Sequence, residues 1–332
     1  MEKRFRILLI ILLAISLVLA VLLVIPTVFN QDLVRVNHIV PNISRLSSPA
    51  MPVSQTFSFE NSTVTISTTI NSSVYRGAKN TDKLIYTHPG VPVATWEGAS
   101  ARAMIQDPAQ DEFYDDLLGS FRAIRSEQNL TDDEYAELLT AYVQSLKYRA
   151  SNDSAKYPIE TVYDGEGDCD DTSYLLAGLL SREGYRVALF LFEHKNHMVV
   201  GIGSDDNLYY GTGYAFVDIM DYSFIGVPVN RLNGAKDTYL DPIVIPIGTG
   251  TKIYHSGGET RYISDMATLT YQRSGNLALR MKNIPQDTPE NISEYNRIVS
   301  DFNADSRVYT YIIRHRFDRP GVFAYLKREM PA

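Results

Sequence analysis

The 332-residue sequence contains a single cysteine, Cys169, and a single tryptophan, Trp96. It has no Cys-x-x-Cys pair, no His-Glu-x-x-His segment, no glycine-rich phosphate loop and no internal repeat. These absences exclude an internal disulfide and leave nucleotide-binding and zinc-hydrolase functions without a motif. The lone thiol has three interpretations: a buried apolar side chain, an intermolecular disulfide or a nucleophile.

An excess of positive charge is also missing. The chain has 39 Asp and Glu residues against 31 Lys and Arg residues, and its net charge at pH 7 is −8. The first six residues carry a net +2, so the rest of the chain carries −10. A chain this acidic is a poor partner for nucleic acid. With 45% hydrophobic residues, it can bury a core of one large or two modest domains.

One long apolar run, Ile7 to Phe29, contains no charged residue. It is long enough to span a bilayer and longer than the apolar region of a cleavable signal peptide, so we predict an uncleaved transmembrane helix, with cleavage as the alternative. Lys3, Arg4 and Arg6 precede the run, which predicts a cytoplasmic N-terminus. The chain is therefore predicted to be a single-pass protein of the cell membrane with an extracytoplasmic C-terminal domain.

Six Asn-x-Ser/Thr sequons lie beyond the apolar run, as expected of an exported domain that carries glycans. They are at Asn42, Asn61, Asn71, Asn129, Asn152 and Asn291.

Composition and periodicity divide the chain into five predicted regions. These are a cytoplasmic tip and anchor (1–30), a stalk without regular structure (31–52), a small β-rich region (53–105), a main domain (106–240) and an α/β extension of uncertain role (241–332).

Local signals predict individual elements. Alternating apolar residues around the turn at Asn61-Ser62 predict a β-hairpin. Asp107-Pro108 begins one helix, and a capping box of Thr131 and Glu134 begins the next. A helix over 173–182 and strands at 185–192, 197–202 and 214–219 follow, which predicts an α+β fold.

The last ninety residues have weaker signals. Strand-like stretches are expected around Ile243, over 252–254 and over 267–271. A helix is expected over 289–302, and a β-rich tail from Val308.

Cys169 is predicted to lie just before a helix, where the helix N-terminus favours the thiolate form that attacks carbonyls. The neighbouring Asp168, Asp170 and Asp171 would raise the pKa of the thiol if they pointed at the sulfur. We expect these carboxylates to cap the helix and to face away from the sulfur.

A nucleophilic cysteine needs a histidine to take its proton and a polar group to orient that histidine. His197 begins the second predicted strand, and Asp218 lies near the end of the third. Antiparallel pairing of these strands would bring the two side chains together, with the Cys169 helix covering that edge.

Four segments of the chain carry a family resemblance. They are Val143-Gln144-Ser145-Leu146-Lys147-Tyr148, Tyr157-Pro158-Ile159-Glu160-Thr161, Gly165-Glu166-Gly167-Asp168-Cys169-Asp170-Asp171-Thr172 and His197-Met198-Val199-Val200-Gly201. Through these segments, residues 141–228 resemble the transglutaminase-like domains of bacterial and archaeal exported proteins.

The resemblance implies a papain-like core, in which the Cys-bearing helix packs on an antiparallel sheet behind the transmembrane helix. It implies a catalytic triad with Cys169 as nucleophile, His197 as general base and Asp218 as the orienting residue, with Asp221 as the alternative third member. In related folds a glutamine or tryptophan donates a hydrogen bond to the developing oxyanion. Gln144 is the candidate for that role. The alternative for Gln144 is an exposed position near a helix end without a catalytic role. Trp96 fits a packing role better.

His194 and His197 together with Cys169 are also an incomplete zinc set, but a fourth ligand is not evident, and no cofactor or metal is predicted. The predicted function is thiol-dependent acyl transfer on a peptide, protein or cell-envelope polymer: a cysteine hydrolase or protease if water accepts the acyl group, and a cross-linking enzyme if an amine does. The alternative is a non-catalytic surface module that uses the same fold for binding. The sequence does not determine the substrate or the oligomeric state.

Overall fold

The computed structural model describes residues 40–44, 49–87, 90–151, 153–233, 235 and 241–330. The predicted anchor and residues 31–39 of the predicted stalk lie outside these ranges, as does the sequon Asn152. Within the described ranges, none of the helices is both long enough and apolar enough to cross a membrane.

The predicted hairpin consists of β1 (Ala50–Phe59) and β2 (Ser62–Asn71), which pair antiparallel over their full length. Alternation places one apolar face inward, including the buried Phe59 and Ile66. This face packs against α4 (Asp111–Gln128) and α5 (Asp132–Gln144). Residues 50–52, assigned to the unstructured stalk by sequence, are paired in β1, so the stalk prediction is wrong at its C-terminal end.

The rest of the region predicted to be β-rich is helical. It contains α2 (Ser72–Asn80) and α3 (Val93–Ile105). The side chain of Asn71 accepts a hydrogen bond from the backbone N–H of Ser73 at 3.0 Å, which caps α2 directly after the hairpin. The β-rich prediction for 53–105 therefore holds only for the hairpin.

Both predicted helix starts in the main domain are confirmed. The Asp107 side chain accepts the N–H of Ala109 at 2.9 Å at the start of the 3-10 turn η1 (Pro108–Gln110), which leads into α4. At α5, Thr131 N–H donates to Glu134 Oε2 at 2.8 Å, and Glu134 N–H donates to Thr131 Oγ1 at 3.2 Å. These are the two bonds of a capping box.

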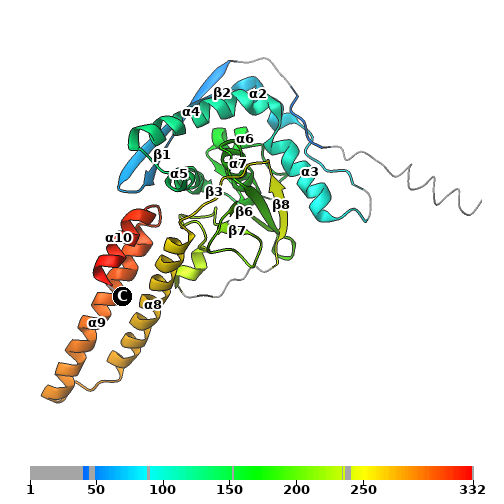
Figure 1. The fold of residues 1–332 in the computed structure, drawn as a ribbon. Coiled ribbons are helices and arrows are strands. Elements are labelled where there is room, and N and C mark those ends of the chain that lie inside the picture. Colours follow the sequence, from blue (N-terminus) through cyan, green and yellow to red (C-terminus); the bar gives the residue numbers. More distant parts are fainter. Residues whose placement is uncertain are drawn as a thin grey trace, which may run out of the picture.

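The central sheet has four antiparallel strands in the order β7-β6-β5-β8 (Figure 1). Their bounds are β5 Val187–Phe192, β6 His197–Gly203, β7 Tyr214–Val217 and β8 Ile243–Ile247. The three predicted strands pair in the predicted order, and β8 completes the other edge although it lies beyond the predicted end of the main domain at residue 240. The helix α7 (Cys169–Arg182) packs against β5 and β6, and α5 packs against α7.

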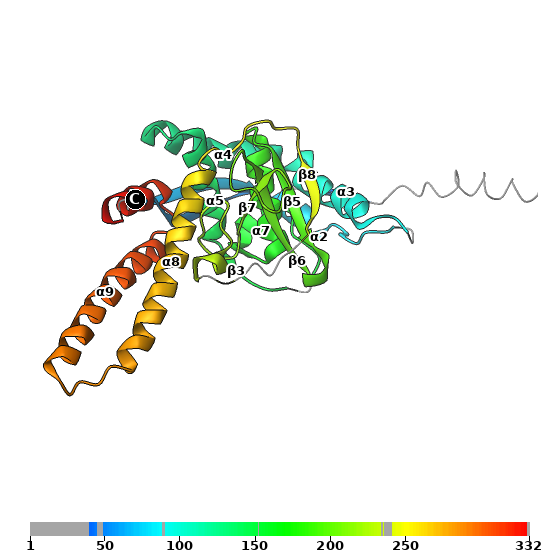
Figure 2. The same cartoon turned by 60° about the horizontal axis from the view of Figure 1, so that its bottom comes forward.

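The C-terminal part is helical and projects away from the sheet (Figures 1 and 2). The helices are α8 (Gly257–Lys282), α9 (Pro289–Arg314) and α10 (Arg319–Glu329), and they share a second hydrophobic core that includes Ile263, Ile312 and Leu326. The strand predicted over 267–271 lies inside α8, and the β-rich tail predicted from Val308 is the end of α9 followed by α10. Both predictions are wrong, because packing between the helices overrides the β-propensity of their Thr, Tyr and Ile residues. The helix predicted over 289–302 is confirmed and extends to Arg314.

Antiparallel strands and separate helices together make this a mixed α+β fold, as the sequence predicts. A large core joins the hairpin, the helices α4, α5, α6 (Pro158–Asp164) and α7, and the central sheet, and the second core lies among the C-terminal helices.

Candidate active site

Cys169 is the first residue of α7, so the helix begins four residues earlier than the sequence predicts. Asp168 is the N-cap, and its Oδ1 accepts the backbone N–H groups of Asp170 at 3.1 Å and Asp171 at 3.2 Å. Asp171 Oδ2 accepts the N–H of Asp168 in return at 3.2 Å, which completes a capping box. The predicted capping role of Asp168 and Asp171 is therefore confirmed.

The two glycines before Cys169 are needed for different physical reasons. Gly165 ends α6 (Pro158–Asp164) in the left-handed conformation, with φ of +67°, where a side chain would be strained. Gly167 lies so close to Asp171 that a Cβ at residue 167 would be 2.7 Å from the Asp171 Cβ. Gly165 thus allows the turn at the end of α6, and Gly167 leaves room for Asp171, which helps to cap α7.

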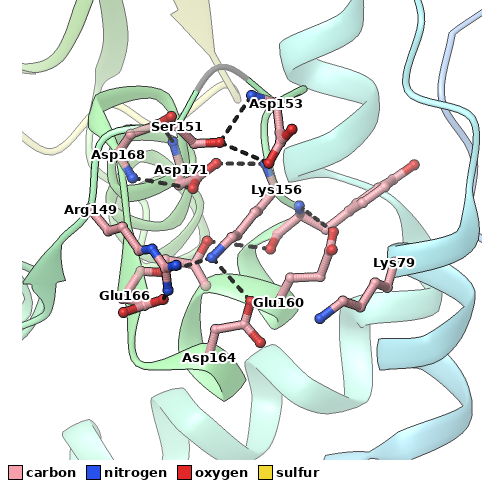
Figure 3. A network of polar contacts seen from close by, with 12 residues as sticks. Lys79, Arg149, Ser151, Asp153, Lys156, Glu160, Asp164, Glu166, Asp168 and Asp171 are labelled. Atoms are coloured by element: carbon pink, nitrogen blue, oxygen red, sulfur yellow. Dashed lines mark hydrogen bonds and ion pairs between the residues drawn. The ribbon is translucent and has the colours of Figure 1, made fainter.

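A polar network holds this turn against α6 (Figure 3). Asp171 Oδ1 accepts the backbone N–H of Lys156 at 2.6 Å, and the ammonium group of Lys156 contacts Asp164 Oδ2 and the Glu166 carbonyl at 3.0 Å each. Arg149 and Lys147 bind the Glu166 carboxylate from the solvent side. Lys156 thus links the start of α7, which its backbone N–H contacts, to the end of α6 and the following loop, which its ammonium group contacts.

The sulfur of Cys169 lies at the start of β6. A backbone hydrogen bond from Met198, the residue after His197, lowers the pKa of the thiol, and α7 packs against β6. The Cys169 side chain is half-buried and packs on the main core. The helix N-terminus therefore brings the only thiol of the chain next to the strand that begins with His197.

Asp170 does not face away from the sulfur, which corrects the expectation for this residue. The thiol of Cys169 donates to Asp170 Oδ1 at 3.5 Å. Burial and the charge of Asp170 raise the pKa of the Cys169 thiol to about 12, more than the Met198 bond lowers it. The resting form is therefore the neutral thiol.

Further acidic side chains surround this position. Burial raises the pKa of Asp170 to about 6, with the charges of Asp168 and Glu97 adding to the effect. Glu97, on α3, accepts a hydrogen bond from the buried hydroxyl of Tyr174 at 3.2 Å, and burial raises the pKa of its carboxyl as well. No local motif in the sequence indicated that Glu97 and Tyr174 belong to this environment, because α3 and α7 meet only in the tertiary fold.

His197 is the first residue of β6, opposite Phe192 of β5. Its ring stacks on the Phe192 ring, with 6.4 Å between the centroids, and the residue is only 8% exposed. Burial lowers the pKa of His197, which favours the neutral imidazole at pH 7. A neutral ring is the form that can accept a proton.

Asp218 directly follows β7 and is half-buried. The ladder pairs Val200 with Val217, and continuing this register by one residue places Asp218 opposite Val199. Because side chains alternate along a strand, Val199 and His197 share a face, so Asp218 occupies the diagonal position to His197 on that face. The sheet therefore brings these two predicted site residues to one end of neighbouring strands.

In the described part of the chain, the Asp218 carboxylate is bonded to backbone groups rather than to the His197 ring. Its Oδ1 accepts the N–H of Met220 at 3.2 Å, and its Oδ2 accepts the N–H of Val229 at 3.1 Å. Burial raises the pKa of Asp218, and these bonds oppose that effect. The alternative residue, Asp221, is exposed and pairs with Arg316 at 2.9 Å.

Gln144, at the C-terminal end of α5, is buried rather than exposed, with 6% of its surface accessible. Its Nε2 donates to the Asp218 carbonyl at 2.6 Å and to the Ser223 carbonyl at 3.1 Å. These two bonds use both amide protons. Gln144 thus fastens α5 to the segment that carries Asp218, and an oxyanion role would require it to release one of these carbonyls.

The zinc alternative gains no support from the geometry. His194, in the 3-10 turn η2 (Glu193–Lys195), is exposed, whereas His197 is buried. Among the described residues, no three His, Cys, Asp or Glu side chains are grouped in a way that suits a metal ion.

Comparison of the chain with protein-family models, with curated proteins and with solved structures found no match in any of the three.

Proposed function

We propose that the chain is a transglutaminase-like enzyme with a papain-like core, which transfers acyl groups through Cys169. The observation that carries this proposal is the contact between the Cys169 sulfur and the backbone N–H of Met198, together with the packing of α7 against β6. It ties the N-terminus of α7 to the first residues of β6, where His197 is located. Along the chain, α7 with Cys169 is followed by β6 with His197 and then by β7, which Asp218 directly follows. This is the order of the triad that the resemblance implies.

The protonation states support a general-base mechanism rather than a resting thiolate–imidazolium pair. Burial and Asp170 hold the thiol in its neutral form, and burial holds His197 neutral. In the proposed reaction His197 takes the thiol proton as the sulfur attacks the carbonyl carbon of an amide or isopeptide bond. The amine leaves with the proton from His197, and a thioester to Cys169 remains.

The second half-reaction releases the acyl group. His197 takes a proton from the incoming water or amine, whose oxygen or nitrogen attacks the thioester carbonyl, and the proton then returns to the Cys169 sulfur. Water yields an acid and an amine yields a new amide, so the same site serves hydrolysis and transamidation. We favour hydrolysis of peptide or cell-envelope substrates.

In this mechanism Asp218 is a positioning residue. A carboxylate diagonal to the imidazole on the same face of the sheet stabilises the imidazolium that forms when His197 is protonated. Gln144 holds the backbone carbonyl of Asp218 and so fixes this segment against α5.

The enzyme is proposed to work outside the cytoplasm, attached by the apolar run of residues 7–29. Fractionation of cells that produce the full chain tests this proposal. We expect the intact chain in the membrane fraction and external protease to digest the C-terminal domain. Recovery from the soluble fraction, or a mature N-terminus beyond residue 25, would contradict the anchor.

The catalytic proposal is tested with a small activated ester, whose acyl group is transferred to Cys169 and detected by mass spectrometry. Acylation should be rapid at pH 7 and should persist below pH ~6.5, the ordinary pKa of histidine, because burial lowers the pKa of His197. His197→Ala should slow acylation by about 10²-fold or more. His194→Ala is the matched control, since His194 is exposed three residues away, and it should leave the rate unchanged.

One observation favours a second candidate, a non-catalytic binding module. The raised pKa of Cys169 is what an inert, partly buried thiol would have. Equal acylation rates in the wild type, His197→Ala and His194→Ala would support this candidate against the enzyme.

A further inference from the structure

A groove between α9 and α10 has a lining that differs from the rest of this acidic chain. Its volume is about 670 Å³, and it lies on the C-terminal helices, which project away from the central sheet (Figure 2). It is lined by Asn303, Ser306, Arg307, Thr310, Tyr311, Arg314, His315 and Tyr325. Every one of these side chains can donate a hydrogen bond, and none of them is a carboxylate.

The two arginines of the groove also differ from the other arginines of α8 and α9. Those two helices contain six arginines. Four of them are paired with carboxylates: Arg261 with Asp206, Arg273 with Asp305, Arg280 with Glu294 and Arg297 with Asp301. Within the described ranges the remaining two, Arg307 and Arg314, have no ion pair, and both line the groove.

The spacing along α9 directs these cations to one face. Tyr311, Arg314 and His315 follow Arg307 by four, seven and eight residues, which is about one or two helical turns. Arg307 and Arg314 are seven residues apart, or about 10 Å along the helix axis. Two arginine side chains, one from each position, can span this distance and reach the same ligand. The groove therefore presents two guanidinium groups to a single ligand.

Aromatic stacking holds this face in place. The rings of Tyr311 and Tyr325 are stacked with centroids 3.8 Å apart, and the His315 ring lies on Tyr311 at 4.1 Å. His315 Nδ1 lies 2.7 Å from the Tyr311 carbonyl, which can only accept, so Nδ1 carries a proton. The charge of Glu329 acts on Tyr325, but this carboxylate is paired with Arg328 at 3.0 Å.

We propose that the groove between α9 and α10 binds a ligand through a phosphate group, held by Arg307 and Arg314. A phosphate monoester has three terminal oxygens, each able to accept more than one hydrogen bond, and guanidinium groups bind it in a bidentate manner. A carboxylate has two oxygens and would leave more of the donors of this groove unused. The proposal concerns a binding site on the C-terminal helices and is independent of the chemistry at Cys169.

The test is isothermal titration of the full chain in a non-ionic detergent. The titrants are inorganic phosphate, glycerol 3-phosphate, dihexanoyl phosphatidic acid, which is a lipid phosphate monoester, and, for comparison, succinate. We expect saturable binding of at least one phosphate compound, weakened at least about 10-fold by Arg307→Gln together with Arg314→Gln. Arg297→Gln is the matched control, because Arg297 lies on the same helix and is already paired with Asp301 at 3.2 Å, and it should not change the affinity.

The titrants also distinguish the source of the phosphate. Binding of glycerol 3-phosphate identifies a soluble phosphate ester, whereas binding of the phosphatidic acid alone identifies a lipid headgroup. The proposal is overturned if no phosphate compound binds saturably, if the double variant binds as tightly as the wild type, or if succinate binds more tightly than every phosphate compound. The single variants are measured as well, so that the result does not depend on the double variant alone.

Discussion

The thiol of Cys169 donates a hydrogen bond to the carboxylate of Asp170, the next residue in the chain, at 3.5 Å. A helix N-terminus usually favours a thiolate, but here the adjacent negative charge and burial act in the opposite direction and raise the pKa of the thiol. The proton therefore remains on the sulfur, and in the proposed mechanism a base must remove it.

Asp170→Asn should lower the pKa of the Cys169 thiol, because it removes a negative charge next to the sulfur. Alkylation by iodoacetamide at pH 8 should become roughly tenfold faster. Burial is the larger cause of the raised pKa, so the labelling midpoint should remain above that of an ordinary cysteine. Asp115→Asn, at an exposed position on α4, is the control and should not change the rate. An unchanged rate in Asp170→Asn would show that the carboxylate does not act on the thiol.

Gln144→Ala separates the two roles considered for this residue. Loss of the amide leaves the carbonyls of Asp218 and Ser223 without their donor, which should reduce the free energy of unfolding by about 1–3 kcal/mol. If Gln144 only fastens the Asp218 segment, acylation by an activated ester and alkylation by iodoacetamide should change by similar factors. A selective loss of acylation of about 10²-fold would instead assign Gln144 to the oxyanion, because alkylation develops no oxyanion.

Gly167→Ala should destabilise the chain by about 1–3 kcal/mol, since the new methyl group would overlap the Asp171 Cβ and disturb the cap of α7. Gly119→Ala is the matched control: Gly119 lies within α4 and has open space around its missing Cβ. That substitution should stabilise the chain by up to about 1 kcal/mol through helix propensity. Denaturant unfolding of both variants measures the difference, and equal stabilities would contradict the close approach at Gly167.

Arg319→Met should destabilise the attachment of the C-terminal helices to α5. Arg319 is 8% exposed, its Nε lies 2.6 Å from Glu137 Oε1, and it also binds Glu259. Removing one partner of a buried pair leaves an uncompensated charge, which typically costs about 3–5 kcal/mol.

The pH dependence of this variant follows from Glu137. Burial raises the pKa of Glu137 to about 7, and Arg319 opposes that shift, so the pKa should rise further in Arg319→Met. A carboxyl with a raised pKa lowers stability as the pH rises from its unfolded pKa through its folded pKa. Unfolding measured at pH 5 and pH 8 should therefore show the greater loss at pH 8. Adding Glu137→Gln should remove most of this difference, and a loss that is the same at both pH values would exclude Glu137 as its origin.

Arg297→Met provides the comparison for Arg319→Met. Its pair with Asp301 is exposed and lies within one helix, so its loss should change the unfolding free energy by less than about 0.5 kcal/mol.

Local signals in the sequence determined much of the main domain. The capping box of Thr131 and Glu134, the Asp107-Pro108 helix start and the alternating strands of the hairpin depend on neighbours within four residues, and they form as predicted. The order of β5, β6 and β7 also followed from short connections, since such strands commonly pair as neighbours. These elements bring Cys169, His197 and Asp218 to the same region.

Tertiary structure decided the features that depend on distant contacts. Residues 267–271 have strand-like composition but lie in α8, because that helix buries its apolar face against α9 and α10. The direction of Asp170, the partners of the Gln144 amide and the proximity of Glu97 depend on how α3, α5 and α7 pack. Periodicity and capping determine which elements form. The pKa of the thiol and the partners of each site residue arise only when those elements pack, because burial and charge act through space rather than along the chain.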